Sequence, residues 1–227
     1  DAEPTASGSS TSTPVTTQTL RTSNLQKQLE IRLPATLLAL IETIEELADT
    51  QEVAAFLVGG FVRDFLMNIP NFDLDVVIEG DGIRFGKALA QELKAEWTIH
   101  ERFGTVSIAL PKALNIPQMH HLDIATARTE YYEYPTALPT VERSSIKKDL
   151  YRRDFTINAI AWDPLTGEYI DPFGGRADLQ RRILKAVDPH TFGDDSLRVL
   201  RAVQFAARFE LTLDAGTAAL CSTIGLD

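Results

Sequence analysis

The amino-acid sequence predicts an α/β (α+β) fold in which helices flank a mixed β-sheet. Short apolar or alternating runs, which are typical of strands, take turns along the chain with longer segments that repeat apolar residues three and four positions apart. The hydrophobic content of 44% and the charged content of 24% are those of an ordinary globular protein. Strands that alternate with helices in this way favour layers of helix and sheet around a shared core.

The N-terminal fifth of the chain divides into two parts. Residues 1–22 are rich in Ser and Thr and show no apolar period, so we expect a disordered linker. Residues 23–50 predict N-terminal helices, interrupted at Pro34, which suits the first turn of the second helix. That second helix gathers its apolar residues on one face: Leu37, Leu40, Ile41, Ile44 and Leu47.

Residues 51–190 predict the main domain, and residues 191–227 the start of a helical extension. Strands are expected at residues 53–58, 72–78, 97–100, 105–110 and 119–125, with helices at 61–68, 82–93 and 196–209. We expect the helices on one side of the sheet. Residues 129–145 predict a loop, residues 164–178 a turn-rich hairpin, and residues 149–161 either helix or strand.

The charge and the cysteine count limit the class of protein. A single cysteine, Cys221, excludes an internal disulfide and fits a reducing compartment, so a cytoplasmic location is expected. The absence of 18 consecutive apolar residues argues against a membrane-spanning helix, and no membrane partner is expected. With a net charge of −10, the chain is a poor match for tight nucleic-acid binding, so the main phosphate-binding surface is expected elsewhere.

A glycine pair, Gly59-Gly60, stands between the first predicted strand and the helix that follows it. Backbone amides at such a turn approach a phosphate closely, and a helix N-terminus favours negative charge. Arg63, in the first turn of the helix, adds a fork of donors that suits a phosphate. The alternative interpretation is a tight turn that simply requires glycine.

Asp73 and Asp75 lie two residues apart on the predicted strand 72–78, so both carboxylates are expected on one face of the sheet. Paired carboxylates suit Mg²⁺, which completes its shell with water and substrate phosphates. The alternative is a pair of solvated acids. Asp123, on the strand 119–125, is a candidate third carboxylate that completes the metal site or accepts a proton, unless it pairs with Arg128.

The glycine pair and the acidic pair are close in sequence, separated by one helix and one turn. A triphosphate at the glycines would therefore lie near metal ions at the carboxylates. This layout is the one that phosphoryl or nucleotidyl transfer with two metal ions requires.

Four motifs, in this order, resemble those of class II tRNA nucleotidyltransferases and bacterial poly(A) polymerases. They are residues 57–66 (LVGGFVRDFL) followed by 73–75 (DLD), residues 152–159 (RRDFTINA), residues 171–175 (DPFGG) and residues 194–202 (DDSLRVLRA). The resemblance spans residues 53–213 and implies a polymerase-beta-like nucleotidyltransferase head followed by the start of a helical neck. Two positions depart from the family pattern: Asp194 replaces a Glu, and Asn68 replaces a Gly at the expected left-handed end of a helix.

The resemblance implies a role for each matching residue. Asp73 and Asp75 correspond to the metal-binding pair, with Mg²⁺ as the cofactor, and Asp123 falls where related polymerases often keep a third carboxylate. The positions expected around the nucleotide are Gly59, Gly60, Arg63, Arg153 and Asn158 at the triphosphate, Asp154 at the ribose, and Asp195 and Arg198 at the base. A carboxylate accepts a hydrogen bond from the exocyclic amine of adenine or cytosine, while an arginine donates to ring acceptors.

The activity implied is template-independent transfer of AMP from ATP, or of CMP from CTP, to the 3′ end of a tRNA with release of pyrophosphate. Residues 128–139 are more similar to the corresponding loop of A-adding enzymes than to the longer loop of full CCA-adding enzymes, which favours AMP. A bacterial poly(A) polymerase, a complete CCA-adding enzyme and a nucleotide-binding regulatory module without turnover are the alternatives. The tRNA or other RNA 3′ end is expected to be held mainly by C-terminal domains that are absent from this sequence.

Overall fold

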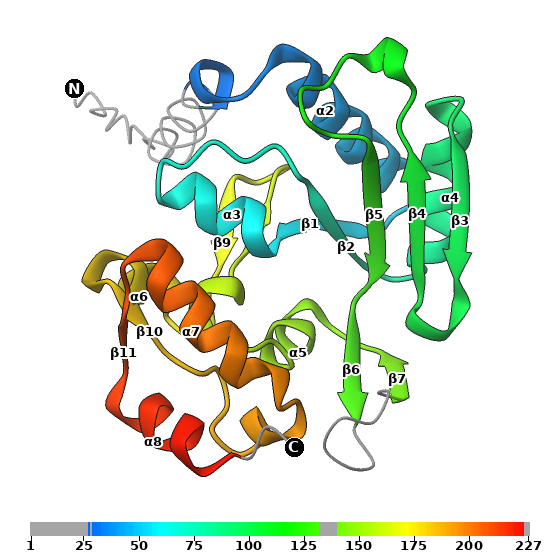
Figure 1. Cartoon of the computed structure of the whole chain (residues 1–227). Helices are drawn as coiled ribbons and strands as arrows, with labels where there is room; N and C mark the ends of the chain where they lie inside the picture. Colours follow the sequence, from blue (N-terminus) through cyan, green and yellow to red (C-terminus); the bar gives the residue numbers. More distant parts are fainter. Residues whose placement is uncertain (1–26, 28, 132–139, 225–227) are drawn as a thin grey trace, which may run out of the picture.

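The structure of the chain is a computed structural model that describes residues 27, 29–131 and 140–224, so the predicted linker lies outside the described residues. Within them, the central feature is a seven-stranded sheet with the order β3-β4-β5-β2-β1-β8-β9 (Figure 1). Its strands are β1 Ala54–Val58, β2 Asp75–Glu79, β3 Glu96–His100, β4 Thr105–Ala109, β5 His121–Thr126, β8 Ala161–Asp163 and β9 Glu168–Ile170. Strands β2 and β5 pair in parallel and the other neighbours antiparallel, which confirms the predicted mixed sheet.

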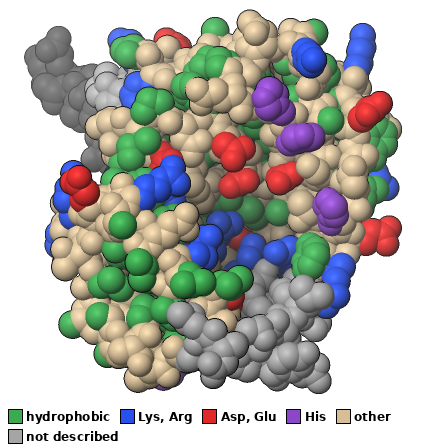
Figure 2. All heavy atoms as spheres, in the orientation of Figure 1, with side chains coloured by type: hydrophobic (Ala, Val, Ile, Leu, Met, Phe, Trp, Pro, Cys, Tyr) green, Lys and Arg blue, Asp and Glu red, His purple; other side chains and the backbone are tan. Residues whose placement is uncertain are grey.

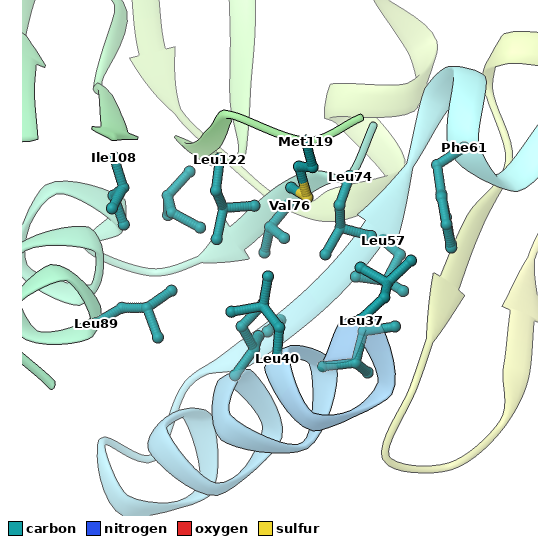
Figure 3. Close-up of a cluster of buried hydrophobic side chains, with 14 of the residues drawn as sticks. Leu37, Leu40, Leu57, Phe61, Leu74, Val76, Leu89, Ile108, Met119 and Leu122 are labelled. Atoms are coloured by element: carbon teal, nitrogen blue, oxygen red, sulfur yellow. The ribbon is translucent and has the colours of Figure 1, made fainter. Parts of the chain in front are cut away.

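Two helices pack on one face of this sheet and enclose the larger apolar core. They are α2, Ala35–Thr50, and α4, Gly82–Glu92. Figure 3 shows side chains from both helices meeting those of the sheet, with Leu37, Leu40 and Leu89 opposite Leu57 and Val76. Each buried aliphatic side chain contributes about 1.5–3 kcal/mol relative to an exposed one, so this layer holds the sheet rigid. Pro34 lies one residue earlier than expected, as the N-cap of α2.

The opposite face of the sheet carries helix α5, Ile146–Tyr151, so the prediction that the helices lie on one side is wrong for this element. Ile146 and Leu150 of α5 pack in one cluster with Phe56 and Val77, which point away from the larger core because side chains alternate along a strand. Two hydrogen bonds fix the position of the helix: the Ile146 N–H donates to Glu79 Oε2 at 2.8 Å, and Asp149 Oδ2 accepts from the backbone of residue 128 at 3.1 Å.

Three further segments differ from the sequence-based prediction. The expected loop 129–145 has paired ends, β6 Arg128–Tyr131 and β7 Thr140–Arg143, and residues 132–139 lie outside the described residues. The ambiguous segment 149–161 holds the end of α5 and a 3₁₀ turn, η3 Thr156–Asn158. The expected hairpin at 164–178 is confirmed for the turn between β8 and β9, but it is followed by helix α6, Gly175–Arg181.

The C-terminal part forms a second apolar core. Helix α7, Leu197–Phe209, and helix α8, Ala215–Thr223, pack against Phe155 and Phe192, and α7 adds Phe205 to this core. The short strands β10, Ile183–Leu184, and β11, Thr212–Leu213, pair in parallel and join this part to the head. The domain boundary at residue 190 stays a prediction. Among the described residues, we find no helix that combines the length and the apolar character needed to cross a membrane.

Candidate active site

A polar cavity of about 510 Å³ opens between the start of helix α3, Gly59–Leu66, the loop that leads into β2, and helix α7. Figure 2 shows this hollow, with acidic side chains along its upper side and Lys or Arg side chains along its lower side. The residues that line it are Gly59, Gly60, Arg63, Asp64, Pro70, Asn71, Asp73, Asp75, Gln118, Arg153, Asn158, Arg201, Phe205 and Arg208. Seven of the sequence-predicted site residues therefore face one cavity: Gly59, Gly60, Arg63, Asp73, Asp75, Arg153 and Asn158.

Gly59 lies between an acidic and a basic side chain of the cavity. Its φ of +67° lies in the left-handed region that favours glycine, because the buried strand β1 turns directly into α3 at this residue. A Cβ atom at Gly59 would lie 3.4 Å from Arg153 Nη1 and 3.6 Å from Asp75 Oδ2. The predicted glycine turn between strand and helix is confirmed, and it leaves the backbone open to a ligand between a carboxylate and a guanidinium.

The two candidate metal-binding acids both reach this cavity, but only one of them belongs to a strand. Asp75 is the first residue of β2 and pairs with Val58, the last residue of β1. The predicted strand 72–78 therefore begins three residues late, because β1 turns into α3 beyond Val58 and offers no further partners. Asp73 precedes the sheet, and both carboxylates are exposed to the cavity.

Asp123 lies directly opposite Asp75 on the neighbouring parallel strand β5. It is exposed and close enough for its charge to affect Asp75, but it is not among the residues that line the cavity. Its role as a third catalytic carboxylate stays a prediction.

The acidic side of the site has a crowded negative charge. Burial raises the pKa of Asp75 and the carboxylates of Asp73 and Asp123 raise it further, whereas the guanidinium of Arg153 lowers it. Because Asp75 is still open to the cavity, water there moderates the effect of burial. Like charges that repel one another are stabilised when a cation lies among them.

Arg153 supplies positive charge next to these acids. Its Nη2 atom lies 3.2 Å from Asp149 Oδ1 on α5, an ion pair that holds the guanidinium toward the cavity. Its Nε atom is buried and has no hydrogen-bond partner within the part of the chain that the structure describes. A buried donor that the protein leaves unsatisfied is uncommon.

A hydrogen-bond network joins α3 to the RRDFTINA segment and to α7. Arg63 Nη1 donates to Asn158 Oδ1 at 2.7 Å, and Asn158 Nδ2 donates to Asp154 Oδ1 at 3.1 Å. Asp154 Oδ2 then accepts from Arg201 Nε at 2.7 Å. The guanidinium of Arg63 also lies over the ring of Phe209, 4.4 Å from its centroid. Three of the residues predicted from the motifs are therefore linked side chain to side chain.

The predicted base-reading pair does not face the cavity in this structure. Arg198 is buried, and its guanidinium donates to the backbone carbonyls of Arg152 at 2.8 Å and Thr191 at 3.1 Å. Asp195 Oδ1 accepts from the backbone N–H of Leu197 at 3.0 Å. Their role in reading a base stays a prediction.

Helix α7 instead presents three other residues to the cavity, Arg201, Phe205 and Arg208. None of the three is among the site residues predicted from the sequence. Their spacing of four and three positions on the predicted helix 196–209 is the signal that could have found them, since such residues share one face.

The residues present fit a divalent metal ion. Two neighbouring carboxylates that face a cavity are the oxygen ligands that Mg²⁺ uses together with water and substrate phosphates. Among the described residues, no group of three or more His, Cys, Asp or Glu side chains forms a complete metal cage. A metal ion here would be held by Asp73 and Asp75 and would need ligands from the substrate.

A mixed sheet with paired carboxylates at the start of β2, beside a glycine turn and several arginines, is an arrangement suited to nucleotidyl transfer. The chain belongs to the poly A polymerase head domain family, whose model matches residues 55–185. This family consists of nucleotidyltransferases, which generally use divalent metal ions. The predicted family and fold class are thereby confirmed.

Named relatives agree with this assignment. The chain is 42% identical over 179 residues to an A-adding tRNA nucleotidyltransferase of Geobacter sulfurreducens, covering 78% of this chain and 20% of that protein. It is 41% identical over 186 residues to an A-adding tRNA nucleotidyltransferase of Halalkalibacterium halodurans, covering 81% and 42%. The apo structure of a CCA-adding enzyme superposes with a TM-score of 0.77 at 37% identity, covering 87% of this chain and 46% of that one. The chain thus spans less than half the length of these relatives.

Proposed function

We propose that the protein transfers AMP from ATP to the 3′ end of a tRNA, with release of pyrophosphate and with Mg²⁺ as the cofactor. One observation carries the proposal: a single cavity holds Asp73 and Asp75 next to Gly59 and Arg153. The paired acids are suited to metal ions, and the open backbone and the guanidinium are suited to a triphosphate. Transfer of a nucleoside monophosphate requires both close to the reacting phosphorus, where they stabilise the attacking and the leaving oxygens of an in-line displacement.

In the reaction, the RNA 3′ hydroxyl oxygen forms a bond to the α-phosphorus of ATP, and the bond from that phosphorus to the bridging oxygen breaks. Asp73 and Asp75 would hold Mg²⁺, which would lower the pKa of the attacking hydroxyl and neutralise charge on the phosphates. Arg153, which lines the cavity, and the amides of Gly59 and Gly60 would bind phosphate oxygens. Pyrophosphate leaves with the electrons of the broken bond, and the proton of the hydroxyl passes to water.

Two arginines of α7 extend the positive side of the cavity. Arg201 and Arg208 lie across from the acids, and Phe205 lies between them on the same helical face. Charge from α7 would oppose the four negative charges of ATP, and the aromatic edge offers apolar contact to a base or ribose. The proposal also includes binding of ATP or CTP, contact with a tRNA, and a cytoplasmic location.

Addition of AMP is favoured over addition of all three CCA nucleotides because the relatives from Geobacter sulfurreducens and Halalkalibacterium halodurans are both A-adding enzymes. Complete CCA addition is the second candidate, supported by the structural similarity to a CCA-adding enzyme. A regulatory module that binds nucleotide without turnover has no need for two carboxylates facing one cavity, so the site argues against it.

The test uses the full-length protein and tRNA transcripts that end before CCA, after C and after CC. Each is incubated with Mg²⁺ and labelled ATP or CTP. A single AMP added to the CC end alone is the expected result. Entry of both labels would instead establish a CCA-adding enzyme, and long A tails a poly(A) polymerase. ATP binding without label in any RNA would overturn the catalytic proposal.

A further inference from the structure

Asn71 lies in the loop between α3 and β2 and lines the cavity, although no motif drew attention to it. Both polar atoms of its side-chain amide make hydrogen bonds. The Nδ2 atom donates to Asp64 Oδ2 at 2.8 Å, and the Oδ1 atom accepts from the backbone N–H of Asp73 at 2.9 Å. A residue two positions before an N–H is well placed for this bond, which fixes the backbone of the later residue.

Asp64 connects this amide to the predicted phosphate-binding arginine. Asp64 is 1% exposed, and its Oδ1 atom accepts from Arg63 Nε and Nη2, both at 2.8 Å. The two oxygens of one buried carboxylate therefore bind Arg63 on one side and Asn71 on the other. A buried carboxylate held in this way cannot move without breaking charge-assisted hydrogen bonds, which are stronger than those between neutral groups.

Asp73 needs such a contact because the sheet does not hold it. The ladder between β1 and β2 starts with the pair Val58 and Asp75, so the backbone of Asp73 has no strand partner on β1. Its carboxylate is exposed in the cavity. A metal ligand has to be held within about 0.5 Å of its working position, and residues on loops achieve this only through supporting hydrogen bonds.

We propose that Asn71 is a positioning residue that holds the metal-binding Asp73 in register with the phosphate-binding Arg63, through Asp64. The inference rests on the proposed function, since it takes Asp73 as a metal ligand. It requires an amide at position 71, because only a side chain with both a donor and an acceptor makes the two bonds. Serine in its place would still accept from the Asp73 N–H but is too short to reach Asp64.

The test measures Mn²⁺ binding to the full-length protein without nucleotide, by the loss of the free-ion paramagnetic resonance signal. Loss of a supporting contact to a metal ligand weakens metal affinity by about 10–100-fold. We expect Asn71→Ala to raise the Mn²⁺ dissociation constant by about tenfold. Asn71→Ser should raise it by at least about threefold, which is half of that effect on a logarithmic scale. Thermal unfolding of each variant, recorded in EDTA, shows whether it still folds.

Asn68→Gly is the matched control. Asn68 is an exposed residue of the same loop with a φ of +58°, which glycine also adopts, and it does not line the cavity. The Mn²⁺ affinity of the Asn68→Gly protein should stay within twofold of that of the unmodified protein.

Asp73→Ala separates failure of the positioning role from failure of the proposed function. If Asp73→Ala weakens Mn²⁺ binding while a folded Asn71→Ala protein binds as tightly as the unmodified one, the positioning role is overturned and the metal site stands. If Asn71→Ser binds normally while Asn71→Ala does not, the link through Asp64 is overturned. If Asp73→Ala binds Mn²⁺ normally, the proposed metal site itself is wrong.

Discussion

The guanidinium of Arg201 donates a hydrogen bond of 2.7 Å to the carboxylate of Asp154, and this contact joins helix α7 to the segment predicted to bind the ribose. Arg201 is 47% exposed, so solvent weakens the ion pair and ~1 kcal/mol is a fair value for its loss. We therefore expect Arg201→Ala to raise the KM for ATP by about fivefold in steady-state AMP incorporation. Arg84→Ala, at an exposed arginine of α4 on the far face of the sheet, is the control. An unchanged KM for Arg201→Ala would show that this contact does not support nucleotide binding.

Asp75→Asn should abolish transfer and yet stabilise the protein when metal is removed. The raised pKa of Asp75 means that its negative charge costs folding free energy at pH 7, because burial and two neighbouring carboxylates oppose ionisation. An amide removes that cost, so in EDTA at pH 7 we expect an unfolding temperature higher by roughly 2–4 °C, which is ~1 kcal/mol. Differential scanning fluorimetry measures the shift. A lower unfolding temperature would contradict the account of crowded charge.

Gly175 allows helix α6 to lie directly against the 3₁₀ turn that carries Asn158. A Cβ atom there would lie 2.0 Å from the backbone carbonyl oxygen of Thr156, which cannot move aside as a side chain could. Gly175→Ala should therefore lower the free energy of unfolding by about 3 kcal/mol in urea denaturation.

The neighbouring Gly174 provides the matched control. Its φ is +74° and no atom lies within 4 Å of the added Cβ, so Gly174→Ala should cost only the ~1 kcal/mol of left-handed backbone strain. Equal destabilisation by the two substitutions would show that close packing is not the reason for glycine at position 175.

Glu45, on helix α2 far in sequence from the site, predicts a pH-dependent stability. Partial burial first, and then the charges of Glu42, Asp163 and Glu46, raise its pKa from 4.5 to about 7. The folded protein therefore binds a proton more readily than the unfolded chain does, and stability is lost as the pH rises from 4.5 through 7. Glu45→Gln should be more stable by on the order of 1 kcal/mol at pH 8, after allowance for solvent screening, and by little at pH 4.5.

Urea denaturation across that pH range measures this effect. Glu92→Gln, at an exposed glutamate of α4, is the control and should show no such gain. A constant difference between Glu45→Gln and the unmodified protein at every pH would contradict the prediction.

Most of the fold follows from local sequence patterns. The buried run that forms β1, the apolar face of α2 and the glycines that begin α3 each determine their element through neighbouring residues, and each prediction is confirmed. The position of α5 is different, because Ile146 and Leu150 show only that the helix has one apolar face. Its place on the second face of the sheet depends on the distant partner Glu79, which a local pattern does not reveal.

The site shows the same division. The short distance in sequence between Gly59 and Asp75 predicts that they lie close together. The structure agrees, because β1 ends at Val58, which pairs with Asp75 at the start of β2. The contribution of Arg201 depends on how α7 packs against residues 152–158, which is a long-range contact. Asn71 was missed because an isolated Asn in a loop has many uses, and only its two hydrogen bonds distinguish it.

The most direct test of the account is the rate of AMP incorporation into a tRNA transcript ending in CC, with Mg²⁺ and saturating ATP. Asp73→Asn and Asp75→Asn are compared with the unmodified full-length protein and with Glu92→Gln. We predict that each Asp variant loses at least about 100-fold in rate while Glu92→Gln keeps full activity, because in the proposed mechanism the paired carboxylates hold the metal ions for transfer. Incorporation at the unmodified rate by either Asp variant would contradict the assignment of this cavity as the active site.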